Sequence, residues 1–176
     1  VMHGLQIWAR LPIAEQDVAP DYRAYQSEEM IEWSEGDVRF RLIAGEFKAR
    51  KGPLPIALPS VLVHVYLKAG SSVKLDLPNS EHEYGCYVVQ ASDHLTINNA
   101  QRLTQGDMMR LSNVSDSIEV SLKSDTPAEL FLLGGEPAPQ PIVFGGSFVL
   151  DSEDAIRQAQ RRFRAGDMGT LDGVPF

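Results

Sequence analysis

Period-two alternation of apolar side chains is the feature that most constrains this chain. Residues 61–67 read Val-Leu-Val-His-Val-Tyr-Leu, so every odd position carries an aliphatic side chain. In an extended chain, side chains two residues apart share a face, and the segment therefore predicts a strand with one buried face. The segment is far too short to cross a bilayer as a helix, which needs about 20 apolar residues.

Similar short segments recur at intervals of about eight to twelve residues, a spacing typical of an all-β sandwich or barrel. We expect these strands at residues 38–43, 73–77, 87–90, 95–97, 108–111, 118–122 and 130–133. Asn98-Asn99 and Gly106-Asp107 are suited to turns, because Asn and Gly tolerate positive φ. Residues 48–59 contain four Gly or Pro residues and are expected to form a loop.

One helix is expected over about residues 152–165. Ser152 can cap its N-terminus, two acidic residues lie in its first turn, and Gly166 can end it. Ile156 and Phe163 share an apolar stripe, which we expect to bury at least partly against a sheet. Arginines fill the second half of the helix, where they complement the helix dipole, so we interpret this basic patch as a helix feature rather than an anion site.

The N-terminal segment differs from the rest. Residues 5–11 alternate apolar and polar side chains and predict a half-buried strand that Pro12 ends. Residues 13–37 are rich in acidic residues and proline and are expected to form a surface connector. An apolar strand without a sheet invites pairing with another chain, so we also expect self-association through residues 3–11.

The composition excludes several classes of function. The net charge of −8 repels nucleic acid, and no apolar run is long enough to span a membrane, so neither is an expected partner. The single cysteine, Cys86, cannot form an internal disulfide, which makes a cytoplasmic location the default. We expect Cys86 to be a small buried side chain rather than a nucleophile.

Motifs at both ends of the chain carry a family resemblance. Residues 132–137 read Leu-Leu-Gly-Gly-Glu-Pro, and Pro-Ile-Val at 141–143 and Gly-Ser-Phe-Val-Leu at 146–150 follow before the helix. At the start, residues 3–12 read His-Gly-Leu-Gln-Ile-Trp-Ala-Arg-Leu-Pro, and an aromatic-Gln element follows at Tyr25-Gln26. Together these segments resemble the C-terminal portion of the pirin family, whose HGLQLW-type segment joins its two domains.

The resemblance implies a fold and a division of the chain. Pirins are bicupins, so we expect an all-β, cupin-like jelly-roll sandwich with one C-terminal helix and a long N-terminal connector. Residues 1–12 would be the last strand of the missing N-terminal cupin, residues 13–37 the connector, and residues 38–176 the C-terminal cupin-like domain. The family's iron ligands, three histidines and a glutamate, lie upstream of the HGLQ-type segment, and the chain is then a piece of a longer protein.

No cupin metal motif is found in this sequence. The four histidines are His3, His64, His82 and His94, and no two are spaced as H-x-H. Glu81-His82-Glu83 lies near the place of a cupin's first metal motif but offers a single imidazole. We therefore expect no catalytic, cofactor or metal residue here, with His82 and Glu83 as the alternative metal site. Gly134-Gly135 is interpreted as a tight turn before Pro137 rather than a phosphate loop.

Three functional hypotheses follow. The first is an accessory domain without an iron site, which packs against the iron-bearing N-terminal cupin of a pirin-like protein. The second is a stand-alone, dioxygenase-like cupin enzyme that uses a non-standard site near His82. The third is a protein-interaction module of a transcriptional regulator. The resemblance implies the background to all three, because the family includes iron dioxygenases acting on flavonols such as quercetin and regulators that bind transcription factors.

Overall fold

The computed structural model describes residues 4–16, 18–19, 21–77, 79, 81–111, 117–122, 125–137 and 140–169. The chain divides into two compact units. The sandwich unit runs from Tyr25 to Pro137, and the terminal unit combines residues up to Ala24 with residues from Ala138 onward.

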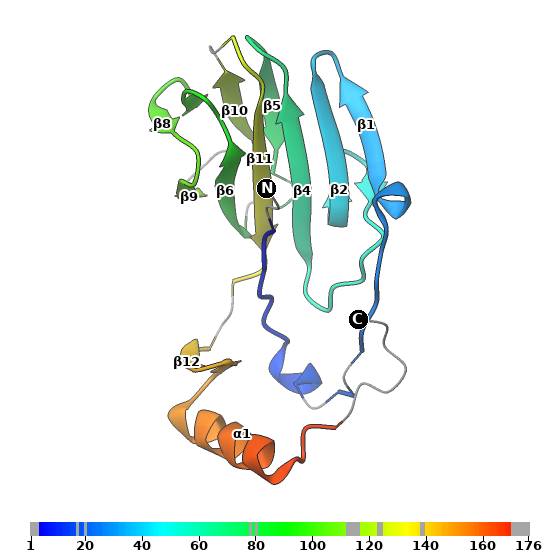
Figure 1. The fold of residues 1–176 in the computed structure, drawn as a ribbon, viewed down its shortest axis with the longest axis vertical. Helices are drawn as coiled ribbons and strands as arrows, with labels where there is room; N and C mark the ends of the chain where they lie inside the picture. The colour runs from blue at the N-terminus through cyan, green and yellow to red at the C-terminus, as the bar shows by residue number, and fades with distance from the viewer. Residues whose placement is uncertain are drawn as a thin grey trace. The chain divides into compact units, whose positions relative to one another are not determined.

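The larger sheet of the sandwich unit is antiparallel throughout its described pairings and is shown in Figure 1. Its strands, in spatial order, are β1 (Ile31–Glu35), β2 (Val38–Phe47), β4 (Ser60–Leu67), β11 (Ala128–Gly135), β6 (Glu83–Gln90) and β9 (Met108–Leu111). A short strand, β3 (Arg50–Lys51), pairs with the end of β2. A 3-10 turn, η2 (Ser27–Glu29), precedes β1.

The smaller sheet consists of β5 (Ser72–Asp76), β10 (Ser117–Leu122), β7 (Leu95–Ile97) and β8 (Gln101–Leu103), in that order. The hydrophobic core takes its side chains from strands of both sheets. The largest fully buried side chains are Phe40, Phe47, Leu42, Leu67, Leu75, Leu95, Ile97, Ile118, Leu130, Leu132 and Val38. The predicted all-β sandwich with one helix is confirmed.

The alternation at residues 61–67 has the predicted consequence. Odd positions of β4 are buried and even positions are half-buried, so one face of the strand lies in the core. The predicted turns are also present, since Asn98, Asn99 and Gly106 all have positive φ. The alternation of apolar residues in this segment therefore corresponds to the burial of one face of β4.

The predicted connector contains a strand that the sequence analysis missed. Residues 31–35 form β1 at the edge of the larger sheet, rather than extended surface chain. The reason is aromatic packing: the Trp33 ring stacks on Phe40 with centroids 4.9 Å apart, and the Arg50 guanidinium lies 4.3 Å from the Trp33 ring centroid. The prediction of a connector over 13–37 is therefore wrong at its C-terminal end.

The strand predicted at residues 5–11 does not pair within this chain, and its pairing with the N-terminal cupin stays a prediction. Residues 4–12 form no strand, and a 3-10 turn, η1 (Ile13–Glu15), follows them. Alternation makes a segment amphipathic, but a strand also needs a neighbouring backbone to pair with, and no described segment pairs with this one. His3, the first residue of the predicted association segment, lies outside the described residues.

The terminal unit contains the predicted helix, α1 (Glu153–Ala165), and a hairpin of β12 (Val143–Gly145) and β13 (Phe148–Leu150). The Ser152 hydroxyl caps the helix by accepting from the Ala155 N–H at 3.2 Å, and Gly166 ends it with a φ of 80°. The Arg10 side chain ties the N-terminal segment to this unit, because it donates to the carbonyls of Gln140 and Pro141.

The apolar stripe of α1 is buried at one end only. Ile156 is 4% exposed and packs where Gly145 of β12 leaves room, since a Cβ on Gly145 would lie 2.2 Å from the Ile156 side chain. Phe163 contacts Phe148 edge-on at 6.1 Å but remains 65% exposed. The expected burial of the stripe is thus confirmed for Ile156 and wrong for Phe163.

A pair of glycine substitutions tests the packing of β2 against β4. Gly36 and Gly45 both have left-handed φ, so alanine should cost about 1–2 kcal/mol of unfolding free energy at either position. At Gly45 the added Cβ would also lie 1.6 Å from the Ser60 carbonyl oxygen, whereas at Gly36 nothing lies within 4 Å. We expect Gly45→Ala to cost about 4 kcal/mol or more in urea melts. Equal costs for the two variants would contradict this packing.

Candidate functional site

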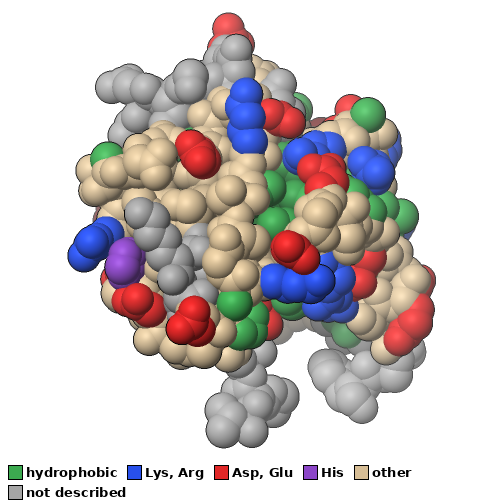
Figure 2. All heavy atoms as spheres, turned by 90° about the horizontal axis from the view of Figure 1, so that it is seen from above, with side chains coloured by type: hydrophobic (Ala, Val, Ile, Leu, Met, Phe, Trp, Pro, Cys, Tyr) green, Lys and Arg blue, Asp and Glu red, His purple; other side chains and the backbone are tan. Residues whose placement is uncertain are grey.

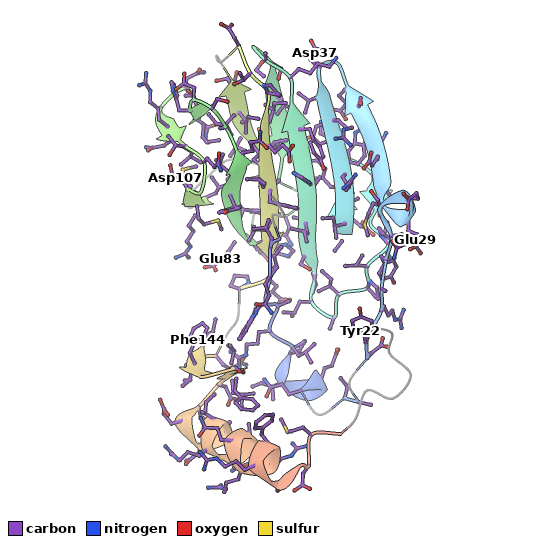
Figure 3. All side chains as sticks on the ribbon, viewed as in Figure 1. Tyr22, Glu29, Asp37, Glu83, Asp107 and Phe144 are labelled. Carbon is purple, nitrogen blue, oxygen red and sulfur yellow. The ribbon has the colours of Figure 1, made fainter. Side chains whose placement is uncertain are left out.

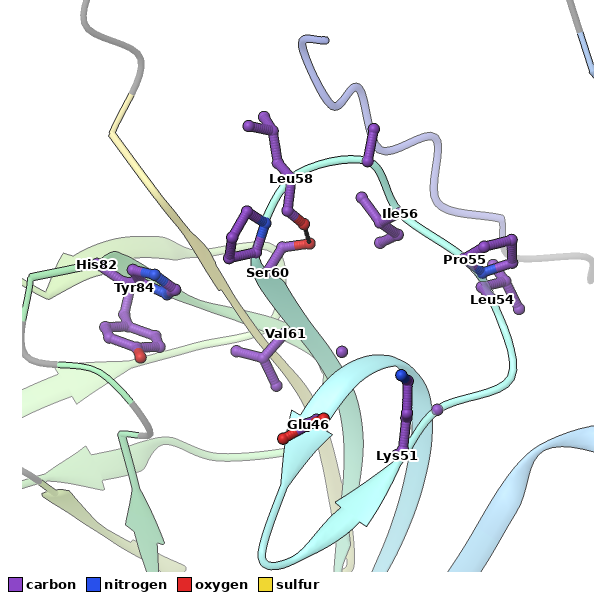
Figure 4. Close-up of a pocket in the computed structure, with 14 residues that line it drawn as sticks. Glu46, Lys51, Leu54, Pro55, Ile56, Leu58, Ser60, Val61, His82 and Tyr84 are labelled. Carbon is purple, nitrogen blue, oxygen red and sulfur yellow. Dashed lines mark hydrogen bonds between the residues drawn. The ribbon is translucent and has the colours of Figure 1, made fainter. Parts of the chain in front are cut away.

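A hollow of about 540 Å³ opens at one end of the sandwich unit, between the 52–59 loop and the strand ends beside it (Figure 4). This volume is within the range of small-molecule sites. The apolar part of its wall comes from Leu54, Pro55, Ile56, Leu58, Pro59 and Val61. The segment that the sequence analysis interpreted only as a loop therefore builds most of the hollow.

Backbone hydrogen bonds fix the 52–59 loop at both ends. The N–H of Gly52 donates to Gly45 at 2.8 Å, and the N–H of Leu54 donates to Ile43 at 3.1 Å. At the other end the Pro59 carbonyl accepts from the N–H of Glu136 at 3.1 Å. Because the loop is held to the sheet at these points, the hollow has a defined wall without any bound molecule.

Tyr84 is the aromatic residue that lines the hollow. Its ring is buried, and its hydroxyl donates to the Asn79 carbonyl and accepts from the Asn79 N–H, both at 3.0 Å. Gly134 makes room for this ring, since a Cβ there would lie 2.2 Å from Tyr84 Cδ1. Gly134 and Gly135 are the last residues of β11, so the predicted tight turn at this pair is wrong. Their role is close packing of strands.

Three titratable side chains besides Tyr84 line the same hollow: Glu46 from β2, Lys51 from β3 and His82 from the turn before β6. The hydroxyl of Ser60, at the start of β4, also lines it and donates to the Leu58 carbonyl at 3.0 Å. Glu46 and Lys51 face each other across the β2–β3 ladder. Figure 4 shows His82 and Tyr84 on one side of the opening, with Lys51 on the other and pointing toward the loop. The arrangement combines an apolar wall with a small number of charged groups.

The alternative metal pair, His82 and Glu83, does not converge. His82 lines the hollow with Tyr84, two residues on, whereas Glu83 is exposed at the start of β6 and forms an ion pair with Arg110 of β9 (Figure 3). Neighbouring residues of an extended segment point to opposite sides, which accounts for the separation. Over the part of the chain that the structure describes, no group of three or more His, Cys, Asp or Glu side chains could hold a metal.

His64 belongs to a different place, the outer face of the larger sheet. Its ring stacks on Phe131 at 4.3 Å and lies 4.0 Å from the Tyr66 ring, and its side chain is 12% exposed. Arg39 lies over the Tyr66 ring at 3.7 Å. The Nε2 atom lies 3.1 Å from Glu129 Oε2 but in a direction that makes no hydrogen bond.

Burial of His64, together with the nearby Arg41 and Arg39 charges, lowers its pKa from 6.5 to about 4, although Glu32 acts in the opposite direction. The imidazole is therefore neutral at physiological pH. A neutral ring packed between aromatic side chains fits a structural role.

Cys86 is fully buried in the core, and this burial raises the pKa of its thiol to about 12. A thiol of this kind is not a nucleophile at neutral pH, as expected.

Charged side chains of both signs intermingle on the face seen in Figure 2. The ion pairs of the described residues include Lys68 with Asp37 and Lys48 with Glu35. No helix in the described ranges is long and apolar enough to cross a membrane.

Comparison with known families decides the relationship of this chain. Residues 62–169 match the model of the pirin C-terminal cupin domain. The chain belongs to the pirin family. This match includes the Gly134-Gly135 pair, the β12–β13 hairpin and helix α1, which are the C-terminal features that carried the resemblance in the sequence.

Curated relatives confirm the pirin relationship over nearly the whole chain. The chain is 26% identical to human pirin over 167 residues, which cover 95% of this chain and 57% of that protein. It is 32% identical over 171 residues to a Pseudomonas aeruginosa protein that carries the name of a quercetin 2,3-dioxygenase, with 94% of this chain and 59% of that protein covered. The chain thus spans somewhat more than half the length of these relatives.

The fold is shared with a solved structure. Quercetin 2,3-dioxygenase from Acinetobacter baumannii superposes with a TM-score of 0.82 at 23% identity, covering 92% of this chain and 55% of that one. At this identity the likeness shows the fold alone. The cupin-like architecture predicted for this pirin-family chain is confirmed.

The pKa of His64 predicts a pH dependence of stability. Because the pKa is depressed in the folded state, the unfolded chain binds the proton more tightly, and stability should fall as the pH drops from about 6.5 to about 4. We expect this residue to account for about 2–3 kcal/mol of the loss. Urea melts at about pH 7 and about pH 4.5 should give a smaller loss for His64→Gln than for the parent chain.

The matched control is His94→Gln, which changes a histidine paired with Asp93 outside the aromatic stack. This variant provides the reference slope for a histidine substitution outside that stack. If His64→Gln and His94→Gln had the same slope as the parent, the assignment of this pH dependence to His64 would be refuted.

Proposed function

We propose that this chain is the C-terminal accessory domain of a pirin-like protein and packs through its terminal unit against a metal-binding cupin domain. The observation that carries the proposal is the unequal burial of apolar side chains. Among the described residues, Ile156 is the one fully buried apolar side chain of the terminal unit.

The terminal unit exposes apolar surface instead. Eleven of the thirteen large apolar side chains that are exposed in the described ranges belong to it. They are Leu5, Ile7, Trp8, Leu11, Ile13, Val18, Tyr22, Ile142, Phe144, Phe163 and Met168. Trp8 is 54% and Phe144 72% exposed, and Phe144 is labelled in Figure 3. An element this small with so little core needs a partner surface for stability.

The interior of the sandwich unit supports a role without chemistry of its own. Phe40, Phe47 and Leu95 are among the fully buried side chains that occupy it, and no polar or charged residue of the described part is fully buried. A cupin that binds iron turns histidines toward this space. The iron of the family is therefore assigned, in this proposal, to the partner domain.

The lengths of the relatives favour the same partner. Human pirin extends beyond the matched portion, which covers 57% of its length. We assign the partner cupin to sequence encoded upstream of Val1. The buried, unpaired Cys86 is compatible with a reducing compartment, so we propose a cytoplasmic location.

Association with the partner domain is the direct test. The cupin domain encoded upstream, produced separately, should bind this chain in isothermal titration calorimetry. Trp8→Ala and Phe163→Ala should each weaken binding at least about fivefold, because truncation of a central aromatic anchor commonly costs more than about 1 kcal/mol. The matched control is Met108→Ala, which removes an exposed apolar side chain of the sandwich unit and should leave the affinity unchanged.

Self-association is the competing outcome. If residues 3–11 instead pair two copies of this chain, analytical ultracentrifugation should give a dimer whose dissociation constant Trp8→Ala raises, with or without the cupin partner. If the chain were strictly monomeric and also did not bind the upstream cupin domain, the proposed role as an accessory domain would be overturned.

A measurement of oxygen consumption distinguishes the hypothesis of an accessory domain from that of a stand-alone enzyme. This chain with added Fe²⁺ and quercetin should consume no oxygen, because dioxygen activation needs a metal with open coordination positions, and His82 and Glu83 diverge. An oxygen electrode provides the measurement. Turnover that disappears in His82→Ala would assign the reaction to this chain and reject the proposal.

A further inference from the structure

The proposed association with a cupin domain assigns no function to the hollow beneath the 52–59 loop. We propose that it is a binding site for a small zwitterion with an apolar body, of which an α-amino acid with an aromatic or branched aliphatic side chain is the simplest example. The residues that line the hollow all belong to the sandwich unit.

The wall selects an apolar body. Leu54, Ile56, Leu58 and Val61 line the hollow from the loop and from the start of β4. Tyr84 adds an aromatic surface without a free hydroxyl, because Asn79 both donates to and accepts from that hydroxyl. Burying a hydrocarbon side chain against such a wall is favourable in proportion to the apolar area removed from water.

Two opposite charges at the opening select the head group. Glu46 and Lys51 are cross-strand neighbours on β2 and β3, yet within the described ranges neither forms an ion pair. In Figure 4 the Lys51 side chain extends toward the loop, whereas the Glu46 side chain does not. A cation and an anion therefore both border the hollow without neutralising each other.

A zwitterion matches this pair better than a simple ion. A ligand with only a carboxylate would be attracted by Lys51 but repelled by Glu46. A ligand with only an ammonium group would be attracted by Glu46 but repelled by Lys51. A molecule with both groups on one carbon can direct its carboxylate to Lys51 and its ammonium to Glu46 while its side chain enters the apolar space. His82, on the opposite side of the opening, offers a further hydrogen-bonding group.

The site is preformed, which lowers the cost of binding. The loop is fixed by Gly52 and Leu54 at one end and by Pro59 at the other. A Cβ on Gly52 would lie 2.6 Å from the Ala44 nitrogen, so this part of the loop lies directly against β2. A wall that is already ordered loses little conformational freedom when a ligand enters.

Three probes with one apolar body and different head groups test the inference. Phenylalanine carries both charges, 3-phenylpropionate lacks the ammonium, and phenethylamine lacks the carboxylate. We expect the full chain to bind phenylalanine in isothermal titration calorimetry, and to bind each of the other two at least about tenfold more weakly, as loss of a charge-assisted contact implies.

Substitutions assign each contact. Lys51→Met should abolish the preference for phenylalanine over phenethylamine, and Glu46→Gln should abolish the preference over 3-phenylpropionate. Both positions are exposed, so the variants should fold, and thermal melts verify this. Lys74→Met, an exposed lysine on β5 of the smaller sheet, is the matched control and should bind all three probes as the parent chain does.

The same experiment can overturn the inference in three ways. Absence of phenylalanine binding at millimolar concentration would mean that the hollow is not such a site. Equal binding of 3-phenylpropionate and phenylalanine would replace the zwitterion by a plain carboxylate. Binding that Lys51→Met and Glu46→Gln leave unchanged would place the ligand elsewhere on the chain.

Discussion

The pairing of β11 on both of its edges is the interaction on which the rest of the sandwich depends. β11 pairs with β4 from Ala128 to Gly135, and with β6 from Glu129 to Gly135. It thereby joins three segments that are far apart in the sequence, and its buried side chains, Leu130 and Leu132, reach the core. The two glycines at its end let neighbouring elements approach, with Gly134 next to Tyr84 and Gly135 next to Ser60. The end of this strand therefore helps to position Tyr84 and Ser60, two of the residues that line the hollow.

Sequence reasoning succeeded where one face of a segment is buried. Residues 61–67 and 130–133 lie in strands flanked by other strands, and burial imposes on them the alternation that made them recognisable. It was insufficient where pairing rather than alternation decides the structure. Residues 5–11 alternate as clearly but lack a neighbouring backbone within the described part of this chain, whereas residues 31–35 form an edge strand among acidic residues because Trp33 packs on Phe40. The helix was predictable with its caps, since Ser152 and Gly166 act locally.

The candidate site was less accessible to sequence reasoning. His82 was singled out by analogy with cupin metal motifs, and the structure places it at a hollow, but Glu83 turns away to Arg110. Glu46 and Lys51 gave no signal in the sequence, because two charges five positions apart are unremarkable on a polar turn. The tight turn at Lys48 and Ala49, both with positive φ, brings them face to face. The apolar loop residues were visible in the sequence, but their direction depends on backbone contacts with β2 that no local pattern encodes.

The composition of the terminal unit has a consequence for biosynthesis. Its two halves, residues up to 24 and residues from 138, are separated by the whole sandwich unit, which is continuous in the chain. During translation the sandwich can complete its core once Pro137 has left the ribosome, and domains generally fold as units in this order. The N-terminal segment, with Trp8 and its apolar neighbours, must wait for the hairpin and helix α1, and Arg10 finds its acceptors at Gln140 and Pro141 only at that stage. Within this chain, the residues up to 24 thus reach these contacts only after the sandwich unit that follows them, and for that interval their apolar side chains are open to chaperones.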